Sequence, residues 1–121
     1  MTSRVTLSPD PMQVTVRIFG VTVAQSGRAR RLNEVGLPPV HYIPREDVDL
    51  SRLEASTHTS HCPFKGDARY WTLVIGDNRF EDAVWSYETP VADLAPIAGH
   101  MAFWKDRIGP ALEFIVSEQM R

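Results

Sequence analysis

Cys62 is the residue of this sequence best suited to nucleophilic chemistry. The thiolate is the reactive form of cysteine, and a nearby cation favours that form. His61 precedes Cys62 in the chain, and Lys65 follows three residues after it. Two interpretations stay open. Either Cys62 or Lys65 is catalytic, or Cys62 is buried as a small apolar side chain, as unpaired cysteines commonly are. The sequence offers no third residue that we can assign to orient His61 as a base.

Three side chains of metal-binding types lie within five residues, at His58, His61 and Cys62. Zinc would need a fourth ligand. The candidates for it are His41, His100, Asp47 and a water molecule. Successive residues of an extended segment point to opposite sides, so His61 and Cys62 are poorly placed to bind one ion together. We therefore assign no metal here and interpret the histidines as surface or hydrogen-bonded side chains.

Asp47 and Asp49 form a D-x-D pair. This spacing places two carboxylates on one side of an extended backbone, where they could hold Mg²⁺ for phosphoryl or nucleotidyl transfer. The sequence has no glycine-rich phosphate-binding loop, and Lys65-Gly66 is too short to replace one. The simpler interpretation is that Asp47 or Asp49 caps a short helix by accepting hydrogen bonds from backbone N–H groups.

The aromatic side chains form a candidate binding pocket. Trp85 and Tyr87 share one face of a predicted strand, and the strand before it contains Tyr70 and Trp71. Such aromatic residues either pack a core or form the walls of a pocket with a few polar groups. In the pocket interpretation Lys65 or Arg69 supplies charge. The ligand-binding residues would then be Tyr42, Arg69, Trp71, Trp85 and Tyr87.

The elements that must position these side chains are mainly β-strands. Residues 12–18 alternate apolar and polar types, and Gly20 separates them from a second extended run at residues 21–23, which predicts a hairpin. A second hairpin is predicted from residues 69–75 and 79–87, which flank a Gly-Asp-Asn turn. Short strands are also predicted at residues 40–43 and 101–104.

The remaining segments are predicted to be irregular or helical. Residues 1–11 contain two prolines and are expected to form an extended arm, whereas residues 57–67 are expected to form a structured loop. Residues 45–54 suit one or two helical turns, and residues 91–98 suit a short helix interrupted by a proline. After a further proline, the spacing of apolar residues in 111–120 predicts a C-terminal helix.

The composition indicates one soluble domain. The chain has 121 residues, of which 43% are hydrophobic and 23% charged, and this length has room for one core. A net charge of -2 argues against a dedicated nucleic-acid binder, which needs an excess of Lys and Arg. The basic run at residues 28–31 is interpreted as a solvated face. With one cysteine, no apolar signal region and no membrane-length apolar stretch, the cytoplasm is the expected compartment.

Four strings of the sequence together resemble a known family. They are YIPREDV at residues 42–48, TSHCPFKG at residues 59–66, ARYW at residues 68–71 and WSYETP at residues 85–90. Their order and spacing are similar to those of the domain of unknown function four hundred and twenty-seven. That family also carries a nucleotidyltransferase-like label and occurs in bacteria and fungi as small stand-alone proteins. The similarity spans residues 12–108.

The resemblance implies a mainly β fold, a compact antiparallel domain of two sheets with short helices. This tent-like architecture also occurs in methionine sulfoxide reductase B and in small zinc-binding chaperone-like domains. Those relatives hold zinc with four cysteines, which a single cysteine cannot do. The chain would then divide into an extended arm (1–11), the β domain (12–108) and a C-terminal extension (109–121). Both additions are candidates for covering a sheet edge or forming a homodimer contact.

The leading hypothesis is a cytoplasmic β-domain protein that binds an unidentified small polar molecule. The ligand would occupy an aromatic pocket beside the loop at residues 62–66, with Cys62 or Lys65 as the candidate catalytic residue. One alternative is metal-dependent nucleotidyl transfer, with Asp47 and Asp49 as the catalytic carboxylates. Another is a non-catalytic protein-interaction module. The sequence assigns neither a reaction nor a cofactor.

Overall fold

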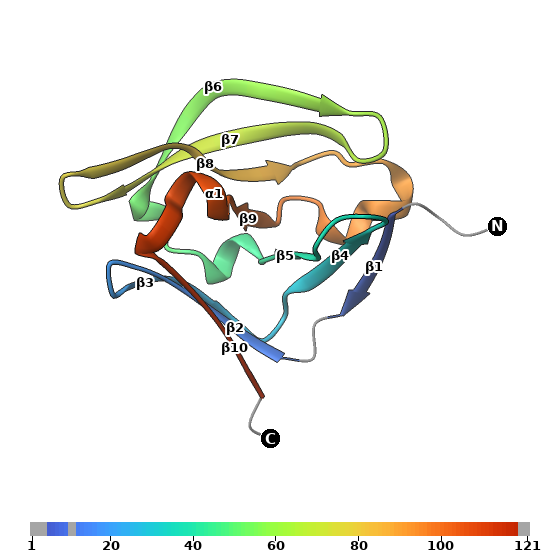
Figure 1. The fold of residues 1–121 in the computed structure, drawn as a ribbon. Helices are drawn as coiled ribbons and strands as arrows, with labels where there is room; N and C mark the ends of the chain where they lie inside the picture. The colour runs from blue at the N-terminus through green and yellow to red at the C-terminus, as the bar shows by residue number, and fades with distance from the viewer. Residues whose placement is uncertain (1–4, 10–11, 119–121) are drawn as a thin grey trace.

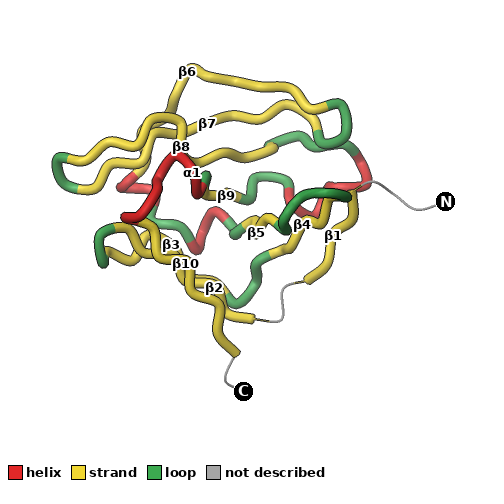
Figure 2. The backbone as a smooth tube through the Cα atoms, in the orientation of Figure 1, coloured by secondary structure: helices red, strands yellow, loops and turns green. Residues whose placement is uncertain are grey.

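The computed structural model describes residues 5–9 and 12–118. Most of these residues lie in β-strands, and the helical segments are single turns or little more (Figure 2). The strands are β1 (Val5–Pro9), β2 (Met12–Ile18), β3 (Val21–Ser26), β4 (Arg30–Glu34), β5 (Val40–Tyr42), β6 (Leu53–Cys62), β7 (Gly66–Ile75), β8 (Asn78–Tyr87), β9 (Met101–Phe103) and β10 (Leu112–Glu118). The helical segments are η1 (Arg45–Asp47), η2 (Leu50–Arg52), η3 (Ala92–Ile97), α1 (Lys105–Ile108) and η4 (Gly109–Ala111).

The strands form three antiparallel sheets (Figure 1). Their orders are β1-β4-β5, β10-β2-β3 and β6-β7-β8-β9. In Figure 1, β6, β7 and β8 of the four-stranded sheet run across the top, β2, β3 and β10 lie below, and β9, the last strand of that sheet, lies between them with β5. An isolated bridge links Ile43, just after β5, to Met101 of β9 through two hydrogen bonds of 2.8 Å. The expected mainly antiparallel β domain is confirmed, with three sheets in place of the two expected.

Both predicted hairpins are confirmed. Strands β2 and β3 are joined at Phe19 and Gly20, whose φ angles are 50° and 77°. Positive φ at both central residues matches the twist of a tight hairpin, and glycine adopts it without strain. Strands β7 and β8 are joined by a short turn at Gly76 and Asp77. The short strands β5 and β9 and the helical turns η1, η2 and η3 also lie where the sequence predicts them.

The loop predicted at residues 57–67 is wrong. Strand β6 extends to Cys62 and strand β7 begins at Gly66, so only residues 63–65 form the turn of a hairpin. Strand β6 is the edge of its sheet, and most of its side chains are exposed. A strand that is exposed on both faces needs no alternation of apolar and polar residues. The periodic signal for a strand was therefore missing.

The helix predicted at residues 111–120 is also wrong. Residues 112–118 form β10, which pairs with the whole of β2 from Leu112 opposite Ile18 to Glu118 opposite Met12. The neighbouring β-branched residues Ile115 and Val116 favour a strand, and the open edge of β2 provides the pairing partner. Part of the predicted N-terminal arm is likewise a strand, since β1 pairs with β4. Residues 1–4, 10–11 and 119–121 lie outside the described residues.

Two hydrophobic clusters form the core, one on each face of the four-stranded sheet. Directly opposite residues of an antiparallel pair share a face. Trp71 pairs with Val84, and both belong to the cluster that includes β2 and β3. Tyr70 pairs with Trp85, and both pack in the cluster that includes Leu32 of β4 and residues of β5 and η3. Adjacent residues of β7 therefore serve different clusters. None of the described helices is long and apolar enough to cross a membrane.

Candidate functional site

A groove lies where β4, β5, β8, β9 and β10 approach one another. Its larger part has a volume of about 560 Å³, and a smaller part of about 190 Å³ adjoins it. The two parts share Val40, Lys65, Trp85 and Trp104 as lining residues. We call the two together the aromatic groove. Its aromatic lining consists of Tyr42, Tyr70, Trp85, Tyr87, Phe103, Trp104 and Phe114.

The β7–β8 register explains why these aromatic residues gather. Tyr70 lies opposite Trp85, and Tyr87 is two residues further along the same face of β8. The Trp85 ring meets Tyr42 edge to face at 6.2 Å between centroids and Trp104 at 6.0 Å. Tyr70 and Trp104 complete the wall at 6.2 Å. The walls of the groove are therefore aromatic rings in contact with one another, drawn from four segments of the chain.

Lys65 and Glu34 form an ion pair inside this apolar setting. The Lys65 Nζ donates to Glu34 Oε1 at 2.8 Å, and the side chains are only 17% and 10% exposed. Lys65 lies in the β6–β7 turn, where its carbonyl oxygen accepts a hydrogen bond from the Val91 N–H at 2.9 Å. Glu34 ends β4. The turn and the strand thus bring one cation and one anion together at the junction of the two parts of the groove.

Two tyrosines of the groove, Tyr42 and Tyr87, have pKa values raised by burial. Burial raises the pKa of Tyr42 well above its usual value, while the hydrogen bond from the Trp85 indole N–H to the Tyr42 hydroxyl, 3.1 Å long, opposes this rise. Burial also raises the pKa of Tyr87, to which the nearby Cys62 and Glu34 add. The Tyr87 hydroxyl has no hydrogen-bond partner within the part of the chain that the structure describes.

Cys62 is half-buried where β6 ends and is not among the residues that line the groove, although it lies close enough to Tyr42 and Tyr87 to affect both phenols. Its sequence neighbour His61 is exposed and shares a 2.7 Å hydrogen bond with Asp67 on the adjacent strand. His61 is therefore held by Asp67 on the surface of the hairpin. His58 packs on the Tyr70 ring. Among residues 5–9 and 12–118, no three side chains of His, Cys, Asp or Glu converge in a way that could hold a metal ion.

Two residues of the predicted ligand-binding set lie away from the groove. Trp71 is on the opposite face of β7 from Tyr70, and Arg69 is on the same face as Trp71. The Arg69 and Arg45 guanidinium groups lie 5.3 and 5.1 Å from the Trp71 ring centre, and both bind Glu88. The structure thus brings Tyr42, Trp85 and Tyr87 together with Lys65. It places Arg69 in a separate surface cluster with Arg45 and Glu88, beside the buried Trp71 ring.

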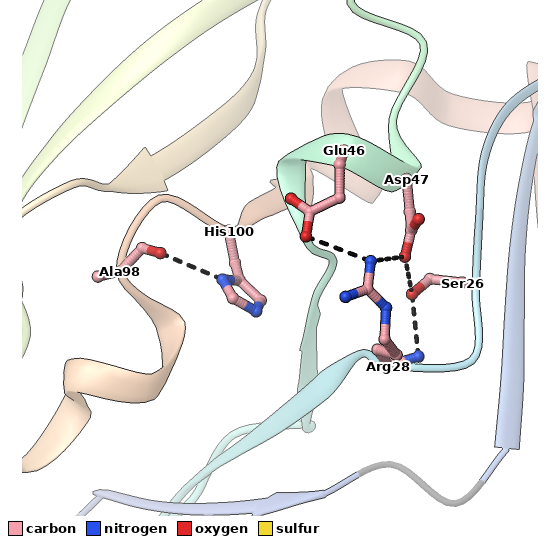
Figure 3. Close-up of polar contacts among 6 residues, drawn as sticks. All are labelled: Ser26, Arg28, Glu46, Asp47, Ala98 and His100. Atoms are coloured by element: carbon pink, nitrogen blue, oxygen red, sulfur yellow. Dashed lines mark hydrogen bonds and ion pairs between the residues drawn. The ribbon is translucent and has the colours of Figure 1, made fainter.

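Asp47 is engaged in a polar cluster away from the groove (Figure 3). Its Oδ2 accepts a 2.6 Å hydrogen bond from the Ser26 hydroxyl and a 3.2 Å bond from the Arg28 guanidinium. Figure 3 shows the Arg28 side chain between Asp47 and Glu46. Asp49 instead caps η2 by accepting from the Ser51 N–H, and the hydrogen bond that it accepts from the Ser51 hydroxyl lowers the Asp49 pKa. The two carboxylates of the D-x-D pair therefore have different partners.

The structure adds groove residues that the sequence reasoning did not include. Glu34 is not among the residues that the sequence singles out, and Trp104 is included there only as part of a strand. Phe114 was assigned to a helix. The sequence signal that could have found Trp104 is its residue type, since it is the third tryptophan of the chain. Nothing in the sequence pairs Glu34 with Lys65, because 31 residues separate them.

The comparisons with known proteins identify a family. Residues 6–113 match the family described as a domain of unknown function, DUF427. The match begins within β1 and ends at the second residue of β10, so it includes every lining residue of the aromatic groove except Phe114. No curated protein matches the chain. By this match over most of its length, the chain belongs to the DUF427 family.

Proposed function

We propose that this domain binds a small organic molecule in the aromatic groove. The observation that carries the proposal is the Lys65–Glu34 pair, which lies largely buried on the groove's apolar lining. Removing two charges from water is costly, and an apolar pair of similar size would often give equal or better stability. An ion pair whose two side chains line an apolar cavity is typical of a small-molecule binding site, where a few polar groups orient the ligand.

The size and the walls of the groove support the same function. Its larger part, about 560 Å³, lies within the range of roughly 300–1,000 Å³ that is usual for small-molecule sites. Trp85 and Trp104 are half-buried, so each ring has one side in the core cluster and part of its surface open to a ligand. Apolar rings with a few polar groups give both affinity and orientation.

Lys65 serves in this proposal as a binding group. Its ammonium group donates to Glu34 at 2.8 Å, and an ammonium group has no lone pair with which to act as a nucleophile. Cys62 is the remaining candidate nucleophile, three residues before Lys65 and outside the groove lining. Nucleotidyl transfer through Asp47 and Asp49 is not proposed, because each carboxylate is engaged with its own neighbours.

The test is a fragment screen followed by two-dimensional NMR of the three indole N–H signals. Fragments that occupy the groove are expected to shift Trp85 and Trp104 and to leave Trp71, on the opposite face of β7, unchanged. Each signal is assigned with a Trp→Phe variant. Lys65→Met should abolish the shifts from polar fragments, whereas Arg69→Met, in the separate surface cluster, should not. The proposal is overturned if no fragment in the library shifts the Trp85 or Trp104 signal at millimolar concentration.

A further inference from the structure

We propose that the ligand of the aromatic groove is a neutral, planar molecule that presents a carbonyl oxygen to Lys65. This inference rests on the proposed function and specifies the chemical class of the ligand.

The formal charges of the residues that line the groove sum to zero. The charged residues are two lysines, Lys65 and Lys105, and two acids, Glu34 and Asp106. Lys105 is further occupied, since its Nζ lies 4.4 Å from the centre of the Phe114 ring. His41 also lines the groove and packs on the same ring. With formal charges of +2 and -2, the groove has no excess charge to attract an ion.

The ammonium group of Lys65 can donate to a ligand without leaving Glu34. It has three N–H donors, and within the described residues one of them is used, in the bond to Glu34. Because Lys65 lines both parts of the groove, the other donors can reach an oxygen atom in the cavity. A neutral carbonyl oxygen accepts such a bond and leaves the ion pair intact.

A charged ligand at this position would be unfavourable. A carboxylate bound to Lys65 would share one ammonium group with Glu34, and two like charges at that distance repel strongly where water is excluded. A ligand cation at the same position would be repelled by the positive charge of Lys65. Separating Lys65 from Glu34 to admit an ion would break a largely buried ion pair, which is costly. The pair therefore selects against both signs of charge.

The rings of the groove favour a flat ligand. Trp85 contacts both Trp104 and Tyr42 edge to face, at interplanar angles of 77° and 88°. These walls bound a space in which a planar ring can lie against an aromatic face. The Tyr87 hydroxyl, which has no partner among the described residues, adds a donor and acceptor at the smaller part of the groove. A carboxamide or a ring carbonyl on an aromatic ring satisfies these features together.

The experiment compares matched probes that differ only in charge. Benzamide, benzoate and benzylammonium form one set, and indole-3-acetamide, indole-3-acetate and tryptamine form a larger one. Each is titrated into the full chain at neutral pH, and the dissociation constant is taken from the shifts of the Trp85 and Trp104 indole signals. We expect each amide to bind at least about tenfold more tightly than both of its charged analogues, a difference of about 1.4 kcal/mol.

A pair of variants tests whether the ion pair causes this preference. Glu34→Gln keeps the size of the side chain and leaves Lys65 as a single positive charge, so the carboxylate probes should then bind more tightly than the amides. Glu46→Gln makes the same chemical change at an exposed residue outside the groove and should leave the order unchanged. Wild-type binding alone decides the inference if the Glu34 variant does not fold.

The outcomes separate the two proposals. Equal or tighter binding of the carboxylates to the wild-type groove overturns the neutral-ligand inference and leaves the proposed binding function standing. If only other library fragments shift the groove signals and neither amide does, the neutral-ligand inference is likewise overturned and the proposed binding function stands. Failure of every probe and every library fragment to shift the groove signals overturns both proposals.

Discussion

At the scale of single residues, Tyr42 connects the groove to the core. Its side chain is only 1% exposed, its ring contacts Trp85 and Tyr87, and its hydroxyl accepts the Trp85 indole N–H. A buried phenol of this kind costs little while it is neutral and much when it is ionised. The residue that shapes the groove wall is therefore also the residue through which alkaline pH acts on the fold.

Stability should fall steeply above the ordinary tyrosine pKa. Burial raises the folded-state pKa of Tyr42 and Tyr87 above 10.0, so at higher pH the unfolded chain loses protons that the folded chain retains. The stabilisation is complete below pH 10 and decreases as pH rises, by about 1.4 kcal/mol per pH unit for each tyrosine. We expect the free energy of unfolding in urea to show this slope.

The Tyr42→Phe variant provides the comparison for this alkaline prediction. Without the Tyr42 hydroxyl the slope should decrease by about one tyrosine's share, or about 1.4 kcal/mol per pH unit. Absorbance of phenolate, followed along the same titration, reports directly which tyrosines ionise in the folded chain. An identical pH dependence in wild type and variant would show that Tyr42 is ionised as readily in the folded as in the unfolded chain.

At the scale of elements, the β6–β7 turn positions Lys65 by a close approach of backbones. Gly66 has a φ of +124°, and a Cβ atom there would lie 3.3 Å from both the Pro90 Cα and the Thr89 carbonyl oxygen. The Lys65 carbonyl accepts a hydrogen bond from the Val91 N–H in the same place. Glycine is needed here for its conformation and for its lack of a side chain.

Gly66→Ala should destabilise the fold and disturb the groove. We expect a loss of about 3 kcal/mol, from backbone strain and displacement of the facing segment. Gly20→Ala is the matched control, because Gly20 has a φ of +77° but nothing within 4 Å of the added Cβ. That variant should lose only about 1 kcal/mol. Urea unfolding of both variants tests this, and equal losses would contradict a role for the contact with Thr89 and Pro90.

Strand β10 forms one wall of the groove, although its own sequence predicts a helix. Phe114 lines the groove, packs on His41 at 5.0 Å between ring centres and lies under Lys105. Its neighbour Ile115 is 38% exposed. Because successive strand residues point to opposite faces, one of these apolar side chains serves the core and the other faces outward.

Truncating the two side chains should therefore have unequal effects. Phe114→Ala is expected to cost about 2 kcal/mol in the free energy of unfolding, since a half-buried ring is removed from the core edge. Ile115→Ala should cost less than about 1 kcal/mol. The measurement is urea unfolding, with groove titration by benzamide as a second readout that only the Phe114 variant should weaken. A larger loss for Ile115 would contradict the observed facing of β10.

At the scale of the whole molecule, β7 and β8 join the two core clusters. Trp71 belongs to one cluster, while Trp85 and Trp104 pack against the other. Tyr70 and Trp71 are adjacent in β7, so unfolding of the strand residues that pack in one cluster also disturbs the other cluster. A small domain with a shared central sheet is expected to unfold in one cooperative step.

The three tryptophans make this cooperativity measurable. Variants that retain only Trp71, or only Trp85 and Trp104, report on one cluster each by fluorescence, and far-ultraviolet circular dichroism reports on the sheets. Within each variant, the urea midpoint by fluorescence should equal the midpoint by circular dichroism. A fluorescence transition that precedes the other would mean that its cluster unfolds separately.

Local patterns in the sequence determined much of the fold. The central hairpins were located by the alternation of Val14, Val16 and Ile18, by the turn residue Gly20 and by the aromatic run at residues 69–75. These patterns are visible because a half-buried strand and a tight turn each restrict the types of neighbouring residues. Residue types alone also led to Lys65 and to Tyr42, Trp85 and Tyr87 as candidate site residues, and the structure places these four together.

Tertiary structure decided what no local pattern records. The exposed edge strand β6 and the C-terminal strand β10 depend on the neighbouring strands β7 and β2 for their hydrogen bonds, so their own sequences predicted a loop and a helix. The Lys65–Glu34 pair joins residues of different sheets. The separation of Trp71 from the groove follows from strand register, since a shift of one residue reverses the face on which a side chain lies.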